Sequence, residues 1–157
     1  MLGANSTRAV MLAGVLVALA VVALDGLIIS DEERLEQHLD ALGAAFSAAD
    51  AGAMDALLAE AFRFDGPRPM GEGDRADSLR RLDEFWLEAS EPALNWRPTD
   101  VVVEGRIGRI QVSGNVRFRY ADSLVVYRVD AVMVWIRANE GWLLERLDAP
   151  LLRPGIL

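Results

Sequence analysis

Asp65 is the side chain whose type and setting could most directly do chemistry. It lies in the stretch FRFDGPRPMG, residues 62–71, where Gly66 and Pro67 follow it directly. A carboxylate at the mouth of a pocket can act as a general base when its pKa suits the proton transfer. A carboxylate before Gly-Pro also shapes turns, because its oxygens accept hydrogen bonds from the backbone just ahead. We expect the turn-forming role and keep catalysis as the alternative.

His38 is the one histidine in a chain that has no cysteine. A single imidazole without thiolates does not supply the ligand set that zinc requires. His38 also flanks Leu35, Leu39 and Leu42, which recur at helical spacing, so we expect a structural role at the boundary of a core. The sequence predicts no metal site and no cofactor.

The charge of the chain excludes nucleic acid as a natural partner. The net charge is −8, and all 16 basic residues are arginine, a composition typical of a bacterium with a GC-rich genome. Proteins that bind nucleic acid carry a basic footprint instead. Residues 31–91 are strongly acidic, whereas arginines slightly outnumber acids in 92–157. Two differently solvated faces explain this asymmetry, and a surface matched to a partner is the alternative.

A long apolar run precedes the acidic region. Residues 9–29 are apolar except for Asp25, and such a helix would span about 31 Å, the thickness of a bilayer core. Asp25 is tolerable near an interface. Ala18-Leu19-Ala20 resembles a signal-peptide cleavage site, but the apolar run continues past it, so we expect a retained single-span anchor. Arg8 predicts that the tail 1–8 stays in the cytoplasm and that the folded domain lies outside the membrane.

Three helices are expected after the anchor. Ser30 with Glu33 forms a capping box, and a helix should run from there to about Asp50. Asp74 can cap the third helix. A second, short helix is predicted from apolar residues at helical spacing, Met54, Leu57, Leu58 and Phe62. The buried side of the third helix is expected to carry Leu79, Leu82, Phe85 and Trp86.

The period of the apolar residues changes from 3.6 to 2 after Pro92. Strands are predicted over 94–104, 107–120, 123–138 and 141–148, which leaves 149–157 as a tail. The order of elements predicts one α+β domain, residues 30–148, in which three helices pack on one face of a curved antiparallel sheet.

Two groups on these strands are candidates for protein contacts. Arg109, Arg117 and Arg119 share one face of a strand, where they could bind an acidic partner or lipid headgroups, or simply be solvated. The stretch AVMVWI, residues 131–136, is apolar on both faces. The helices cover one face, so a second copy, a partner or the tail must cover the other, which carries Val132, Val134 and Ile136.

Three stretches resemble the nuclear-transport-factor-2-like superfamily, including its SnoaL-like and ketosteroid-isomerase-like branches. They are LGAAFSAADAGAMDALLAEAFRFDG, GEGDRADSLRRLDEFW and VMVWIRANEGWLLERLD, within residues 32–148. The resemblance implies a cone: a bent sheet around a pocket that helices close. Members of this superfamily include isomerases, cyclases, dehydratases and epoxide hydrolases. Others are non-catalytic binding or assembly domains, some of which carry a single N-terminal membrane span.

The resemblance places Asp65 near the catalytic base of the ketosteroid-isomerase branch, but the rest of that site is incomplete. An oxyanion hole needs a tyrosine and a protonated acid, whereas the first helix offers Leu42, Ala45 and Phe46. Asp130 could supply the acid, but strand alternation places it on the face that carries Arg128. The epoxide-hydrolase branch uses an Asp–Arg–Asp set. Such a set could come from Arg97, Asp100, Arg128 and Asp130. The alternative is that these residues form ordinary ion pairs across neighbouring strands.

Four tryptophans could line an apolar ligand pocket or form plain core; they are Trp86, Trp96, Trp135 and Trp142. Taken together, the residues favour a membrane-anchored, non-catalytic accessory or assembly subunit that docks on other subunits of a membrane complex or on a second copy. The alternative is a membrane-tethered enzyme or carrier for a small apolar molecule, with Asp65 as general base.

Overall fold

The computed structural model describes residues 29–67, 71–139 and 141–154. Contacts divide the chain into two units, Met1–Ser30 and Asp31–Leu157, and the second is the folded domain. No helix among the described residues has both the length and the hydrophobicity to cross a bilayer. The expected anchor, apart from Ile29, lies outside the described residues.

The domain contains three helices and six strands among the residues that the structure describes. The helices are α2 (Asp31–Ser47), α3 (Ala51–Leu57) and α4 (Arg75–Glu88). The strands are β1 (Leu58–Asp65), β2 (Glu72–Asp74), β3 (Ser90–Glu104), β4 (Ile107–Tyr120), β5 (Ser123–Ala138) and β6 (Gly141–Pro154).

Side-chain caps set the starts of two helices. The carboxylate of Asp50 accepts a hydrogen bond from the N–H of Ala53 at the start of α3. Asp74 does the same for the N–H of Asp77 in α4, as the sequence predicted. Each carboxylate satisfies a backbone donor that has no partner within its own helix.

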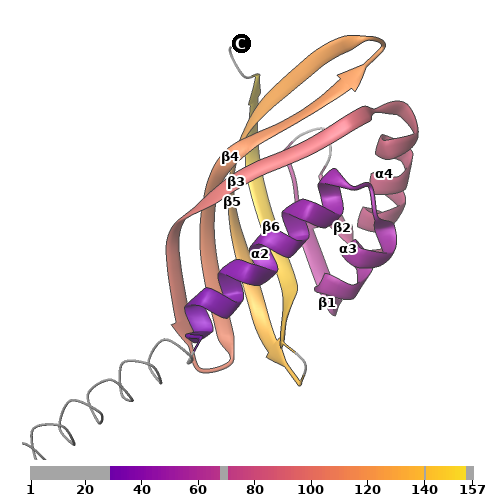
Figure 1. Cartoon of the computed structure of the whole chain (residues 1–157). Helices are drawn as coiled ribbons and strands as arrows, with labels where there is room; N and C mark the ends of the chain where they lie inside the picture. The colour runs from indigo at the N-terminus through magenta and orange to yellow at the C-terminus, as the bar shows by residue number, and fades with distance from the viewer. Residues whose placement is uncertain (1–28, 68–70, 140, 155–157) are drawn as a thin grey trace, which may run out of the picture. The chain divides into compact units, whose positions relative to one another are not determined.

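The six strands form one sheet in the order β2-β1-β6-β5-β4-β3. β3 to β6 form an antiparallel meander, but β1 lies beside β6 and runs parallel to it. The sheet is therefore mixed, and the prediction of a purely antiparallel sheet was wrong. The last strand of the chain inserts between the first strand and the meander, a neighbour relation that hairpin logic does not reveal (Figure 1).

The end of the second helix and the end of the last strand also differ from the prediction. The second helix ends at Leu57, and the next residues form β1, so Phe62 belongs to a strand rather than to the helix. β1 pairs with β6 at Leu58 and again from Arg63 onward, and Phe62 between them is buried to 3% exposure, which outweighs the helical spacing of the apolar residues. β6 continues past Asp148 to Pro154, so the first six residues of the expected tail are strand.

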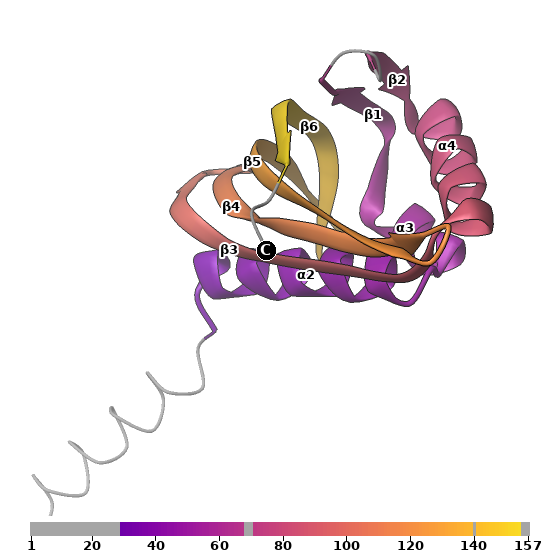
Figure 2. The same cartoon turned by 90° about the horizontal axis from the view of Figure 1, so that it is seen from above.

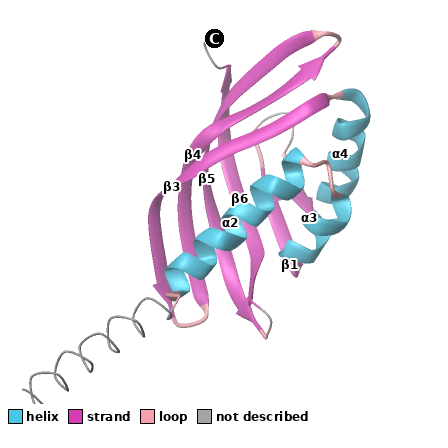
Figure 3. Ribbon diagram, viewed as in Figure 1, coloured by secondary structure: helices cyan, strands magenta, loops and turns pink. Residues whose placement is uncertain are grey.

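All three helices gather on one side of the sheet (Figure 3). Seen from above, the sheet is strongly bent, α2 lies along it, and no described helix covers the opposite face of β4, β5 and β6 (Figure 2). The helix-covered face is the inner face of the cone, and the other is called the outer face below. The core fills the inner face with Leu35, Leu39 and Leu42 of α2 packed against side chains such as Ile110, Met133, Trp135 and Leu144.

Candidate functional site

Asp65 lies on the outer face of the sheet. In β1 the two phenylalanines turn inward, with Phe62 buried and Phe64 packed against the core, so the alternation of the strand turns Arg63 and Asp65 outward. The side chain of Asp65 is exposed, at the last position of the strand. The loop that follows is closed by a backbone hydrogen bond of 3.0 Å from the N–H of Gly66 to the oxygen of Gly71.

The inner face offers an apolar interior rather than a catalytic constellation. Among the described residues, no buried residue is polar or charged. Leu42 and Ala45, at the α2 positions where an oxyanion hole would need a donor, are 2% and 6% exposed and apolar. Proton transfer and oxyanion stabilisation both require polar groups that converge on the reacting atoms. Among the described residues, Leu42 and Ala45 therefore offer no side-chain donor to an oxyanion at these α2 positions.

The tryptophans belong to the core or pack against it. Trp135 and Trp142 are 0% and 2% exposed, while Trp86 and Trp96 are half-buried against the same cluster. The indole nitrogens of Trp86, Trp96 and Trp135 have no hydrogen-bond partner among the described residues. Of the four rings, Trp96 also lines a surface hollow, described next.

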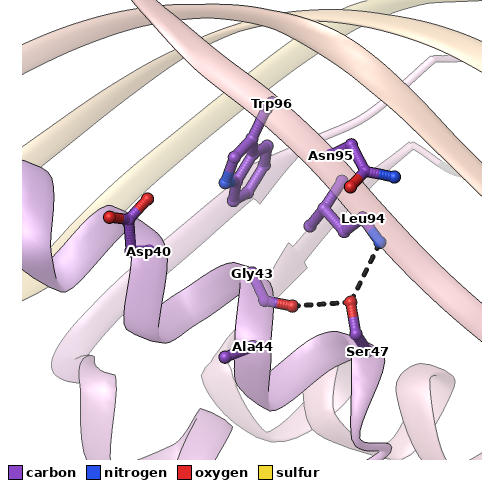
Figure 4. Close-up of a pocket in the computed structure, with 7 residues that line it drawn as sticks. All are labelled: Asp40, Gly43, Ala44, Ser47, Leu94, Asn95 and Trp96. Atoms are coloured by element: carbon purple, nitrogen blue, oxygen red, sulfur yellow. Dashed lines mark hydrogen bonds between the residues drawn. The ribbon is translucent and has the colours of Figure 1, made fainter.

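Two of the open hollows on the described part of the surface lie near residues considered above. The first, about 280 Å³, lies between α2 and β3 and is lined by Gly43 and Ala44 beside Trp96 (Figure 4). The second, about 420 Å³, lies on the outer face where β1, β2 and β6 meet, and it is lined by Asp65 together with Arg63 and Arg146. Trp96 in the first hollow and Phe64 in the second pack against the core, but no residue that lines either hollow belongs to the buried hydrophobic cluster itself.

His38 connects α2 to the start of β6. Its ring nitrogen Nδ1 lies 2.7 Å from the backbone oxygen of Arg34, so this nitrogen carries the proton and donates. Nε2 accepts a hydrogen bond from the N–H of Trp142 at 3.4 Å. The ring also meets Trp135 edge-on, with 6.4 Å between centroids. Both nitrogens are thus engaged in holding the fold together. No cluster of three potential metal ligands occurs in the described ranges.

The four residues considered for an Asp–Arg–Asp site are all exposed on the outer face. Asp130 accepts a hydrogen bond of 2.7 Å from the hydroxyl of Ser113 and lies 3.9 Å from Arg128, its neighbour on the same strand. Arg97 pairs across the ladder with Ser113. Asp100 is exposed on β3. Arg128 and Asp130 therefore form an exposed ion pair, and none of the four residues lines either of the hollows described above.

The outer face gathers the predicted contact residues into two zones. In the first, beside the β3–β4 and β5–β6 turns, Ile107 is 55% exposed and Val102 40%. The half-buried side chains Val132, Val134 and Ile136 complete this zone, called the apolar zone below. Large aliphatic side chains that touch one another at a surface mark a contact site more often than scattered ones do.

Arginines occupy the other zone, toward the β4–β5 turn. Across the β4–β5 ladder, Arg117 pairs with Val126 and Arg119 pairs with Leu124. Arg119 forms an ion pair of 3.1 Å with Glu91. Arg109, by contrast, lies within the apolar zone, paired with Val102 and Val134. The three arginines thus share the outer face, as the sequence predicted, but not one patch.

Sequence reasoning missed the charged residues that β1 adds to this face. Arg63 pairs with Arg146 and Asp65 with Asp148 across the parallel β1–β6 ladder. The Arg146 guanidinium donates to Asp148 at 2.7 Å, and this hydrogen bond raises the pKa of Arg146, with smaller contributions from the charges of Asp65 and Glu72. The alternation in FRFD was the available signal, because it has the period of a strand.

Comparison with known proteins gives the fold a name. No protein-family model and no curated protein sequence matches the chain. A conserved protein from Planctomyces limnophilus superposes with a TM-score of 0.73 at 13% identity, covering 80% of this chain and 98% of that one. A nuclear-transport-factor-2-like protein with a cystatin-like fold, from Novosphingobium aromaticivorans, gives 0.65 at 18% identity over 86% and 87%.

A ketosteroid-isomerase-like protein from Erwinia carotovora atroseptica gives a TM-score of 0.66 at 14% identity, over 78% of this chain and 97% of that one. At such identities the likeness concerns the fold and not the activity. The folded domain therefore has the nuclear-transport-factor-2-like fold, an α+β cone of three helices on a curved mixed sheet.

Proposed function

We propose that this chain is a membrane-anchored, non-catalytic accessory subunit whose folded domain docks on another protein through the outer face of its sheet. The observation that carries the proposal is the apolar zone. Val134 and Ile136 sit on a strand whose inner face is already packed, and Ile107 and Val102 beside them are largely exposed. Covering such a surface removes apolar area from water, which stabilises an association by roughly 25 cal/mol per Å² before the costs of binding.

The membrane part of the proposal rests on residues 9–29 and their apolar composition. Under this proposal, the segment holds the chain in the cytoplasmic membrane of a bacterium, and Arg8 keeps the short tail on the cytoplasmic side. The domain then faces the extracytoplasmic space, where it meets the other subunits of a membrane complex.

The alternative, an enzyme or carrier with Asp65 as general base, gains no support from the geometry. A base must reach its substrate in a site that excludes water. Asp65 instead lies exposed on the outer face, and the hollow beside it is lined mainly by charged side chains rather than by apolar ones.

The test is the composition of the native particle. The full-length chain is extracted in mild detergent, and the particle is weighed by blue-native electrophoresis and identified by mass spectrometry. We expect a particle that contains more than one polypeptide, and we expect Val134→Arg to reduce it to the single chain, because the new guanidinium would be desolvated in the contact without a partner.

Leu87→Arg is the matched control, since Leu87 is 87% exposed on α4, away from the outer face, and its substitution should leave the particle intact. A wild-type particle of one chain, or one that Val134→Arg leaves unchanged, would contradict the proposal.

A further inference from the structure

The free edge of β3 opens into the hollow between α2 and β3. β3 is the outermost strand on its side of the sheet, so only one of its two edges is paired, with β4. Leu94, Asn95 and Trp96 of this strand line one side of the hollow, and α2 lines the other (Figure 4). Backbone groups at a free edge have no partner in the sheet, and they bind water or another chain instead.

The hydrogen bond of Leu94 fixes which backbone groups point out of the sheet. In an antiparallel ladder, alternate residues direct both backbone groups at the neighbouring strand, and the residues between them direct both groups away. The N–H of Leu94 is bound by the hydroxyl of Ser47, so it points away from β4. The register is regular from Ala93 to Pro98, and Trp96 and Pro98 therefore point their backbone groups away from β4 as well.

Trp96 supplies the open donor in this part of the edge. Ser47 already occupies the N–H of Leu94, and Pro98 has no N–H. No side chain in the described ranges accepts a hydrogen bond from the N–H of Trp96. An antiparallel strand added at this edge would therefore exchange both of its hydrogen bonds with Trp96 and donate a further one to the oxygen of Pro98.

Small residues of α2 leave room beside this edge. Gly43 and Ala44 line the side of the hollow opposite β3. A Cβ on Gly43 would lie 3.3 Å from the indole nitrogen of Trp96 and 3.7 Å from the oxygen of Leu94, so a larger residue there would push against the strand. Ala44 is exposed. The helix thus packs closely on β3 and still leaves a hollow of about 280 Å³ beside Trp96.

The charge of the hollow favours a cation. Asp40 is the only charged residue among the described ones that line it. Its carboxylate is exposed and forms no ion pair with any described residue, and the same holds for Glu36, one turn earlier in α2. Two unpaired carboxylates beside an open strand edge attract arginine or lysine, and a guanidinium matches a carboxylate with two hydrogen bonds.

We propose that the free edge of β3 binds an extended basic segment of a partner protein, which pairs with Trp96 as an additional strand. The residue opposite Trp96 projects on the same face as the indole, toward α2, so an arginine at that place pairs with Asp40. The proposal goes beyond the docking function above, because this edge site and the apolar zone of the outer face share no residue.

A model peptide tests the site. The probe is a fluorescein-labelled peptide of alternating arginine and valine, about six residues long, the usual length of a strand. It is titrated with the full-length chain in mild detergent, and fluorescence anisotropy reports binding. We expect saturable binding of this peptide, and none of a peptide that carries glutamate in place of arginine. A basic peptide that shows no saturable binding up to millimolar concentrations would overturn the proposal.

Substitutions on exposed positions locate the peptide. Ala44→Leu fills the hollow and should weaken binding roughly tenfold or more. Ala41→Leu is the matched control, because Ala41 is also exposed on α2 but does not line the hollow. Asp40→Arg should shift the preference toward the glutamate peptide, whereas Asp83→Arg on α4 makes the same change of net charge and should leave the affinity near that of wild type. Equal losses in the two leucine variants would count against the site.

Methylation of the peptide backbone tests the strand pairing. The arginine opposite Trp96 directs its N–H at the edge, and the valines direct theirs away. N-methylation of the arginines should therefore abolish binding, and N-methylation of the valines should preserve it. Loss of binding with both methylated peptides, or with neither, would overturn the pairing. Val134→Arg should not change peptide binding; if it does, the peptide binds the apolar zone and not this edge. Circular dichroism confirms that each variant folds.

Discussion

The hydroxyl of Ser47, the last residue of α2, closes part of the free edge of β3 by accepting a hydrogen bond of 3.0 Å from the N–H of Leu94. The same hydroxyl donates to the oxygen of Gly43 at 2.8 Å, so one side chain ties the helix end to the edge strand (Figure 4). β3 is the outermost strand of the sheet, and its prolines, Pro92 and Pro98, fit an edge position. An edge strand left open invites pairing with other chains.

Ser47→Ala should lower the free energy of unfolding by about 1 kcal/mol, because the N–H of Leu94 loses its acceptor in a part-buried place. Urea titration followed by circular dichroism measures this loss. Ser113→Ala is the control: its hydroxyl meets the exposed carboxylate of Asp130, and the change should stay within about 0.5 kcal/mol. Equal losses of unfolding free energy in the two variants would mean that the Ser47–Leu94 contact stabilises the domain no more than an exposed hydroxyl does.

Gly114→Ala should destabilise the domain by about 2 kcal/mol or more. A Cβ at Gly114 would lie 2.1 Å from the backbone oxygen of Asn95 and 2.5 Å from the Cα of Trp96, and backbone atoms of a paired strand do not move aside cheaply. In Gly52→Ala the Cβ would meet only an oxygen of Asp50, at 3.5 Å. That change lies in helix α3 and should instead stabilise by up to about 1 kcal/mol. Thermal melts of the two variants should therefore shift in opposite directions.

The β4–β5 turn carries removable strain. Ala121 and Asp122 have φ values of 46° and 66°, and the residues on either side, Tyr120 and Ser123, are paired. Two positive φ values in a two-residue hairpin loop belong to a type I′ turn, where an asparagine followed by a glycine is preferred. The double substitution Ala121→Asn with Asp122→Gly should therefore raise the free energy of unfolding by about 1 kcal/mol. An unchanged or lower unfolding midpoint in urea would show that the turn is not strained.

Acid should weaken the link between the start of α2 and the end of β5. A hydrogen bond from Arg137 holds the pKa of Asp31 below its ordinary value of 3.8. A carboxyl with a lower pKa in the folded state stabilises the fold above its ordinary pKa, and this contribution disappears as the pH falls through the folded-state pKa. Asp31→Asn should therefore melt below wild type at neutral pH, and acidification through the ordinary pKa range of aspartate should cost the variant less than it costs wild type.

Salt provides the control for this acid effect, because the pair is exposed and added salt should shrink the difference at neutral pH. Parallel melting curves of wild type and variant over the whole pH range would count against the role of the pair.

Much of the domain was predictable because its signals are local. The cap at Asp74 and the alternation in 107–120 each need only a few neighbouring residues, and both are confirmed. Helix was predicted correctly for Met54 and Leu57, but it was wrongly extended over 58–62, because Leu58 and Phe62 fit a helical spacing as well as a strand. Contact with β6, far along the chain, decides between the two.

The candidate site shows the same division. That Asp130 points with Arg128 away from Val129 follows from strand alternation, and the structure has Val129 buried and Asp130 exposed. The outward direction of Asp65 depends on β1 being a strand of the sheet, so it could not be fixed without the parallel partner. The pairing of Arg63 with Arg146 could not be predicted for the same reason, because these two residues meet only in the folded sheet.

The position of β6 between β1 and β5 also sets when the domain can be completed during synthesis. Leu58 pairs with Leu144, so β1 can pair with β6 only after nearly the whole chain has been synthesised. Until then the helices have a meander of three strands but no anchored β1–β2 hairpin. Contacts so distant in sequence slow folding, and they expose apolar strands meanwhile. A ribosome that stalls before Gly141 would thus hold a chain with two unjoined halves, a natural substrate for chaperones and proteases.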